Sequence, residues 1–241
     1  MNNHICIATG AFHTWTKNIN PNSHIDIARK FDVDGAEITL GFKENLFNLK
    51  LSARNLTWLK KKKYVSIHAP FNLPWNSTNM DDLKRQLKLI ELLYKRVNAK
   101  TVVIHPQDLL PPKLLNRYKF HVSTENMEPK CKVSYSDIKT IFKYFPKAGL
   151  CLDAAHTYLY SKDETKKIIK LFKNKISQIH LSGTYKKKEH KSLLNCTDNF
   201  YYSIKPLKKL TCPIIIEEDI KFTRSIKKVE KEIKFVREFL S

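Results

Sequence analysis

Six short apolar runs of this sequence each end at or beside a histidine, an aspartate or a glutamate. Val, Ile and Leu dominate these runs, so an ionisable side chain at the end of each one stands out. In chain order the six residues are His68, His105, Glu125, Asp153, His180 and Glu217. Imidazoles mixed with carboxylates suit zinc, manganese or iron, whereas magnesium and calcium prefer ligand sets made of oxygen alone. If the runs end close together, the residue types therefore indicate a site for zinc, manganese or iron.

A lone histidine or glutamate at the end of a strand is more often a capping or hydrogen-bonded residue than a metal ligand. Six of them at equivalent positions are different, because burying several carboxylates without a cation costs both desolvation and repulsion energy. We therefore assign the set as a whole to metal. Four other histidines lie at a strand start, in loops or at a helix start, and we expect no chemistry from them: His4, His13, His24 and His121.

Eight apolar runs have the length and composition of strands that are covered on both faces. They span residues 4–9, 35–40, 64–68, 101–105, 120–125, 149–153, 176–181 and 213–217. Segments with apolar residues at helical spacing lie between them and are predicted as helices. These segments span residues 22–31, 44–59, 81–97, 137–145, 164–172 and 225–239.

Strands and helices that alternate along a chain predict a parallel sheet. Eight such units within 241 residues, with no linker between them, favour one α/β domain over residues 1–241, a single (β/α)8 TIM barrel. Only 14 residues separate His105 from Phe120, and they include Pro111 and Pro112, so we expect a shortened fourth helix. The carboxyl ends of barrel strands converge on one mouth, which would bring the six ionisable residues together.

The formal net charge of +21 favours polyanionic partners, because each neutralised phosphate releases counterions. Only seven of the 44 basic residues are arginines, and a coding bias toward Lys and Asn would give the same excess, so both interpretations stay open. Lys186, Lys187 and Lys188 follow the seventh strand on the mouth side, where they can contact phosphates. The lysines at 60–63 precede the third strand, so we expect them on the opposite face as a solvated surface.

The beginning of the sequence lacks the basic-then-apolar pattern of a secretory signal, and no apolar run approaches about 18 residues. The five cysteines are widely spaced and form no C-x-x-C pair, so we expect no disulfide and no zinc ribbon. These features predict a cytoplasmic monomer that does not contact a membrane.

The residues at the ends of the apolar runs resemble those of endonuclease IV, the zinc-dependent apurinic/apyrimidinic endonuclease (AP endonuclease family 2). That family belongs to the xylose-isomerase-like barrels, which also include sugar-phosphate isomerases and epimerases. The resemblance extends from about Ile5 to Glu218, and its most specific part is Gly-Leu-Cys-Leu-Asp-Ala-Ala-His at 149–156. Shorter matches are His105-Pro106, Glu125-Asn126, His180-Leu181 and Glu217.

The resemblance implies a DNA-repair hydrolase that acts on DNA with abasic lesions and uses two or three zinc ions, with Mn²⁺ or Fe²⁺ as alternatives. A hydroxide between the metal ions would attack the phosphorus 5′ to the abasic sugar. The implied ligands are His68, His105 and Glu125 for a first ion, Glu125, Asp153, His180 and Glu217 for a second, and His156 and His190 for a third. Glu125 and Glu217 would be the catalytic carboxylates, and Phe71 would contact DNA.

Two positions depart from the family's pattern. The third ion of the family also needs an aspartate two positions before His190, where this chain has Lys188, and Glu189 is the available substitute. The family inserts an aromatic and an apolar side chain into DNA, and Phe71 fits the first, whereas Asn72 replaces the second. These departures weaken the expectation of a third ion and of family-like DNA binding.

Two other functions stay open. A metal-dependent sugar or sugar-phosphate isomerase or epimerase would need only Glu125, Asp153, His180 and Glu217, one carboxylate acting as the proton-transfer base. A barrel that binds nucleic acid or metal without turnover is the third possibility, and Lys188 is its main support. His68, His105 and His156 exceed what an isomerase needs, which favours the nuclease.

Overall fold

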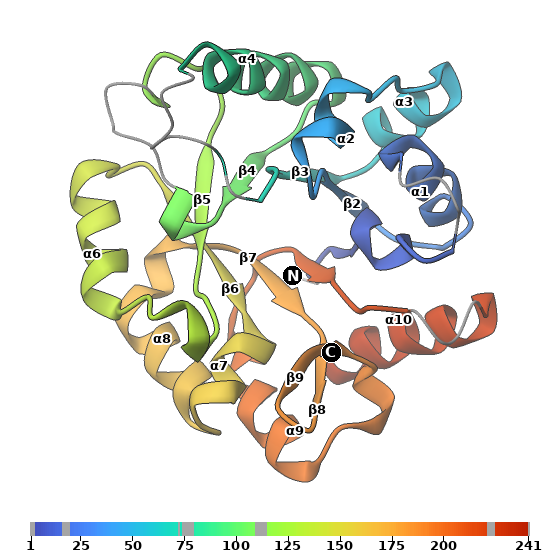
Figure 1. Ribbon diagram of the computed structural model, residues 1–241. Helices are drawn as coiled ribbons and strands as arrows, with labels where there is room; N and C mark the ends of the chain where they lie inside the picture. The colour runs from blue at the N-terminus through green and yellow to red at the C-terminus, as the bar shows by residue number, and fades with distance from the viewer. Residues whose placement is uncertain are drawn as a thin grey trace.

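The computed structural model describes residues 3–15, 20–71, 73, 80–108, 115–220 and 225–240. Eight parallel strands close into a barrel in the order β1-β10-β7-β6-β5-β4-β3-β2, and the helices lie around it (Figure 1). The strands are β1 (Ile5–Ala8), β2 (Gly35–Thr39), β3 (Tyr64–His68), β4 (Thr101–Ile104), β5 (Val122–Glu125), β6 (Gly149–Asp153), β7 (Ile176–Leu181) and β10 (Ile214–Ile216). The predicted (β/α)8 barrel is therefore confirmed.

Nine α-helices lie within the described residues, and six short 3-10 helices connect elements. The α-helices are α1 (Pro21–Ala28), α2 (Lys43–Phe47), α3 (Ala53–Lys60), α4 (Met80–Val97), α6 (Tyr135–Tyr144), α7 (Ala154–Tyr160), α8 (Glu164–Phe172), α9 (Asp198–Ile204) and α10 (Ile226–Leu240). The 3-10 helices are η1 (Thr9–Phe12), η2 (Pro106–Asp108), η3 (Pro129–Cys131), η4 (Lys173–Lys175), η5 (Leu193–Asn195) and η6 (Lys205–Lys209). A hairpin of β8 (Gly183–Tyr185) and β9 (Lys188–Lys191) follows β7.

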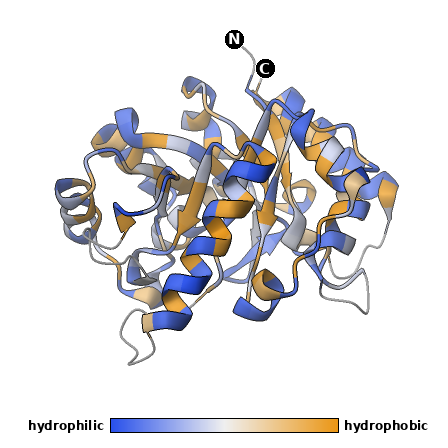
Figure 2. Cartoon of the chain, turned by 90° about the horizontal axis from the view of Figure 1, so that it is seen from above, coloured by the Kyte–Doolittle hydropathy of each residue, from blue (hydrophilic) through white to orange (hydrophobic). Residues whose placement is uncertain are grey.

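The outer faces of the strands pack against the helices and form most of the apolar core. Figure 2 shows apolar residues along the strands and both apolar and polar residues along the helices. One buried cluster joins β1, β6, β7 and β10 to α8, α9 and α10, and a second joins β2, β3 and β4 to α4. Burial of this kind stabilises a fold by roughly 1.5–3 kcal/mol for each large side chain. Most of the core thus lies outside the barrel wall, and a small separate cluster of Cys6, Ala8, Tyr64 and Ile215 shares the barrel interior with the polar residues.

The two-residue period of a strand explains how the polar residues reach the interior. On β6, Leu150 and Leu152 belong to the outer cluster, whereas Cys151 and Asp153 are buried but lie outside that cluster. On β3, Val65 and Ile67 pack outward in the same alternation. Neighbouring side chains of a strand point to opposite faces, so an ionisable residue at the next inward position faces the barrel axis.

The structure differs from the predicted elements in two respects and leaves a third prediction untested. The helix predicted over 44–59 is two helices, because α2 ends at Phe47 and Ser52 starts α3 by accepting the amide hydrogen of Asn55 at 3.2 Å. Helices α7 and α9 and the β8–β9 hairpin were not predicted from the sequence. Between β4 and β5, residues 109–114 lie outside the described residues, so the shortened fourth helix stays a prediction.

Neither the membrane prediction nor the thiol prediction is contradicted. Among the described residues, no helix combines the length and apolar character that crossing a bilayer requires. The five cysteines are free thiols, with Cys6 and Cys151 buried and the other three half-buried.

Candidate metal centre

Side chains from six neighbouring strands meet at the carboxyl-terminal end of the barrel. Their ligand atoms form two groups within which all atoms lie within 4.8 Å of one another. The groups are His68, His105 and Glu125, and Glu125, Asp153, His180 and Glu217. The structure therefore brings the six residues of the predicted site together, while their role as metal ligands stays a prediction.

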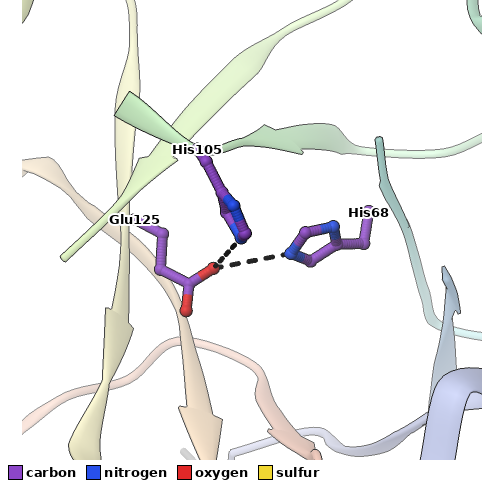
Figure 3. Close-up of side chains that lie close together, drawn as sticks. All are labelled: His68, His105 and Glu125. Atoms are coloured by element: carbon purple, nitrogen blue, oxygen red, sulfur yellow. Dashed lines mark ion pairs between the residues drawn. The ribbon is translucent and has the colours of Figure 1, made fainter. Parts of the chain in front are cut away.

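The first group consists of two imidazoles directed at one carboxylate (Figure 3). Glu125 Oε2 lies 3.5 Å from His68 Nε2 and 3.7 Å from His105 Nε2. His68 Nδ1 donates to the carbonyl oxygen of Ala69 at 3.0 Å, since a carbonyl can only accept, and this leaves Nε2 as the nitrogen that faces the site. This is the orientation that an Nε2 ligand requires.

The two histidines of the first group differ in pKa and therefore in charge. Burial by itself lowers the pKa of His68, but the hydrogen bond to Glu125 and the nearby carboxylates outweigh burial and raise this pKa to about 9. Burial, together with the charge of His68, lowers the pKa of His105 to about 4. Without a cation, protonated His68 would thus balance the charge of Glu125, and a bound cation would replace that proton.

The second group contains three carboxylates around His180. His180 Nδ1 lies 2.7 Å from Glu217 Oε2 and 3.6 Å from Glu125 Oε1. Burial raises the pKa of Glu217, but the charge and hydrogen bond of His180 outweigh it and lower the pKa to about 2. Three carboxylates converging on one imidazole leave an excess of negative charge, which a cation would compensate.

Asp153 tests whether this group fits a metal ion. Its side chain is 0% exposed, and Oδ1 accepts the backbone hydrogen of His156 at 2.6 Å. Oδ2 is buried and has no hydrogen-bond donor among the described residues. Burial raises the pKa of Asp153, as expected for a carboxylate that lacks a full set of partners. An unpartnered, buried oxygen beside two further carboxylates and an imidazole fits a cation ligand, so the residues of the second group suit a metal.

The ligands predicted for a third ion, His156 and His190, do not converge as the residues of the first two groups do. Among the described residues, neither His156 nor His190 belongs to a group of three ligand atoms within 4.8 Å. Their rings lie 6.1 Å apart between centroids, and His190 Nδ1 donates to the carbonyl oxygen of Glu217 at 2.8 Å. Lys188 is exposed, and Glu189 pairs with Lys130 at 3.6 Å instead of with a histidine. The substitution of Glu189 for the missing aspartate is therefore not observed.

A cavity of about 990 Å³ opens above the ligand groups. Phe71 and Lys187, two of the predicted DNA contacts, line it, as does Lys188. Lys186 is not among its lining residues, and its ammonium lies 5.4 Å from the ring centroid of Tyr185. Asn72 lies outside the described residues.

The rim of this cavity carries two exposed phenylalanines. Phe71 is 38% exposed and stacks on His105, with 5.3 Å between the centroids. Phe42 is 60% exposed and contacts the edge of Phe71 at 6.4 Å. The backbone N–H of Phe71 donates to the carbonyl oxygen of Gly41 at 2.7 Å, which ties the loop after β2 to the loop after β3. The aromatic pair is thus held beside the first ligand group.

Several residues that lie in or beside the site were not predicted from the sequence. Glu37 on β2 is 0% exposed and contacts His180, and Glu128 Oε2 lies 3.4 Å from His156 Nε2. His13 and His24, from which we expected no chemistry, line the cavity. A charged residue between Ala36 and Ile38, in the middle of a buried strand, is the signal that would have identified Glu37.

No protein-family model matches the chain, and no curated protein matches it in sequence. Solved structures match it in fold along nearly its whole length. A D-allulose 3-epimerase from Methylomonas sp. is 12% identical with a TM-score of 0.69, covering 99% of this chain and 98% of the other. A D-tagatose 3-epimerase-like protein is 16% identical with a TM-score of 0.67, covering 98% and 97%. Endonuclease IV from Thermus thermophilus is 13% identical with a TM-score of 0.64, covering 98% of both chains. Similarity at these identities extends to the TIM-barrel fold, which this chain shares with both kinds of enzyme.

Proposed function

We propose that the protein is a metal-dependent phosphodiesterase that hydrolyses the bond 5′ to abasic sites in DNA, with zinc as the first candidate metal. The position of Glu125 carries this proposal. Its Oε2 faces His68 and His105, and its Oε1 faces His180, so each oxygen serves one ligand group. A carboxylate with one oxygen toward each of two ligand groups is suited to bridge a pair of ions.

His68, His105 and Glu125 would hold one ion and Glu125, Asp153, His180 and Glu217 another, and such a pair would supply Lewis-acid activation of a phosphoryl group and of a water molecule. The chain's own residues determine where a substrate meets them. The side chain of Glu217 is 18% exposed and lines the cavity, whereas those of Glu125 and Asp153 are 3% and 0% exposed. Glu217 is therefore the carboxylate of the second group that is placed to contact a substrate, and Glu125 is placed to hold the ions.

The cavity rim supports a polyanionic substrate with flat groups. Lys187, Lys188 and Lys191 line the cavity and can contact a phosphate backbone, whereas Lys130 on the same lining pairs with Glu128 and Glu189. Phe42 and Phe71 expose rings on the same rim, and exposed aromatic side chains stack on nucleobases with little dependence on sequence. A free hexose would use neither feature fully, so the rim favours DNA as the substrate.

A sugar epimerase is the second candidate. The group of Glu125, Asp153, His180 and Glu217 alone has the size of a one-metal site. The similar fold of a D-allulose 3-epimerase is compatible with that use of the barrel. The two candidates differ in their need for the first ligand group, because proton transfer beside a metal-polarised carbonyl does not require His68 or His105.

His105→Ala separates the candidates experimentally. The purified protein is stripped with a chelator, reloaded with zinc or manganese, and assayed on a duplex with one abasic analogue and on ketohexoses. We expect incision by the wild type, loss of incision in His105→Ala, and no change in His121→Ala, whose histidine is exposed and precedes β5. Epimerisation that survives in His105→Ala, with no incision by the wild type, would replace the nuclease by the epimerase.

A further inference from the structure

Glu37 is a buried carboxylate that the proposed function leaves without a role. It belongs to β2, is 0% exposed, and meets His180 from β7 across the barrel interior. His180 Nε2 lies 3.1 Å from Glu37 Oε1 and 3.3 Å from Oε2. Burying a carboxylate in a protein interior is costly unless it is paired and hydrogen-bonded, and in this barrel the pairing partner is the central histidine of the second ligand group.

A hydrogen-bond network holds the Glu37 carboxylate in one orientation. Ser66 Oγ and Gln178 Nε2 each donate to Glu37 Oε2 at 2.8 Å. The hydroxyl of Tyr64 donates to Gln178 Oε1 at 2.8 Å, which directs the amide nitrogen of Gln178 toward Glu37. Glu37 and Ser66 are register partners on neighbouring strands, so the network is part of the barrel wall. These bonds fix Oε2 of Glu37, whereas Oε1 accepts no hydrogen bond from the described residues and lies 3.1 Å from His180 Nε2.

The contacts of His180 assign a different partner to each ring nitrogen. Nε2 faces Glu37, and Nδ1 faces Glu217 at 2.7 Å and Glu125 at 3.6 Å. Because a carboxylate only accepts, a hydrogen on Nε2 pairs with Glu37 and a hydrogen on Nδ1 pairs with Glu217, and the Nδ1 hydrogen is the one that a cation bound beside Glu217 would replace. Gln178 Nε2 lies 3.0 Å from His180 Nε2, but its two amide hydrogens have other acceptors, Glu37 Oε2 at 2.8 Å and Cys151 Sγ at 3.4 Å.

We infer that Glu37 is a positioning residue that directs Nδ1 of His180 at the metal and raises the metal affinity of the second ligand group. A histidine ligand whose other nitrogen donates to a carboxylate is oriented and made more basic by that carboxylate. The inference rests on the metal-binding part of the proposed function and not on the reaction, because the second group serves both candidate enzymes. Ser66 and Gln178 act on the metal through Glu37.

Glu37→Gln tests this role, because it keeps the size of the side chain and removes its charge. The loss of such a partner typically lowers metal affinity by about 10- to 100-fold. We expect a loss of this size when zinc is titrated into apoprotein against a chromophoric chelator, and ¹⁵N NMR of His180 in the zinc-loaded wild type should show its hydrogen on Nε2, the nitrogen that faces Glu37. Ser66→Ala removes one hydrogen bond to Glu37, so it should give a smaller loss and also serves if Glu37→Gln does not fold.

Glu91→Gln is the matched control. Glu91 is a buried glutamate on α4 that pairs with Lys88 and Lys95, outside the barrel, so its variant should bind zinc as the wild type does. Wild-type affinity in both Glu37→Gln and Ser66→Ala, or a hydrogen on Nδ1 of His180 in the zinc-loaded wild type, would overturn the inference. Zinc binding that depends on Glu37 in a protein that incises no DNA would instead overturn the nuclease and keep the inference.

Discussion

Glu125→Gln is the substitution with the largest expected effect on the candidate centre. It preserves the shape of the side chain but replaces one carboxylate oxygen by an amide nitrogen, which cannot coordinate a cation. Because each oxygen of Glu125 faces a different ligand group, one group must lose a ligand whichever way the amide turns. We therefore expect the variant to bind one ion fewer than the wild type.

The magnitude follows from burial. Glu125 is 2% exposed, so water cannot replace the lost charge beside His68 and His180. Removing one partner of a buried charge pair costs about 3–5 kcal/mol. If the whole cost falls on the reacting complex, incision slows by about 10²- to 10⁴-fold. The barrel should stay folded, because its two large apolar clusters lie on the outer side of the barrel wall and do not include Glu125.

Three measurements check this prediction on the same preparation. Elemental analysis gives the number of bound ions, a duplex with one abasic analogue gives the incision rate, and thermal unfolding shows that the fold is retained. Glu91→Gln provides a control for replacing a buried glutamate elsewhere in the protein. A Glu125→Gln protein that holds as many ions as the wild type and incises at the same rate would refute the bridging role.

Three further predictions concern the rim and the stability. Phe42→Ala should reduce incision without changing the number of bound ions, as measured by rate and elemental analysis. Lys187→Ala should lower the slope of log affinity for DNA against log salt by about one, in binding titrations. Burial and the neighbouring His13 lower the pKa of His24 to about 4, below its ordinary 6.5. Neutral His24 therefore stabilises the fold above pH 6.5, and this contribution is lost as pH falls through 4; thermal unfolding of His24→Gln should show a weaker loss of stability in acid.

The strands were predictable because their residues carry strong local signals. The limits of β3, β6, β7 and α8 agree with the predicted ranges, since apolar runs between turn formers leave few alternatives. The helices after β2 were less predictable, because Ser52 is a good helix start inside a segment that also fits one long amphipathic helix. Local capping chemistry decided between two helices and one.

Three features of the site were not indicated by the sequence pattern: the role of Asp153 at the start of α7, the position of Glu37 on β2, and the contact of Glu128 with His156. Asp153 was predicted as a metal ligand, but its carboxylate also accepts the amide hydrogen of His156 and begins α7. Glu37 lies in the middle of β2, whereas the predicted ligands were residues at strand ends, so Glu37 was not predicted. The position of Glu128 against His156 depends on the path of the loop after β5, which no periodicity in the sequence describes.

The two ligand groups explain how one barrel can resemble both a nuclease and an epimerase. In both candidate functions the second group would hold an ion, with Glu37 proposed to orient its central histidine, so this part of the centre does not distinguish them. The first group does, because His68 and His105 both face Glu125 Oε2, and His105 is held neutral by burial and by the charge of His68. Because His105 is neutral, it forms no ion pair with Glu125, and its position beside this carboxylate is better suited to binding a metal ion. Under the two proposals, binding of a second ion at His105 would therefore distinguish the nuclease from the epimerase.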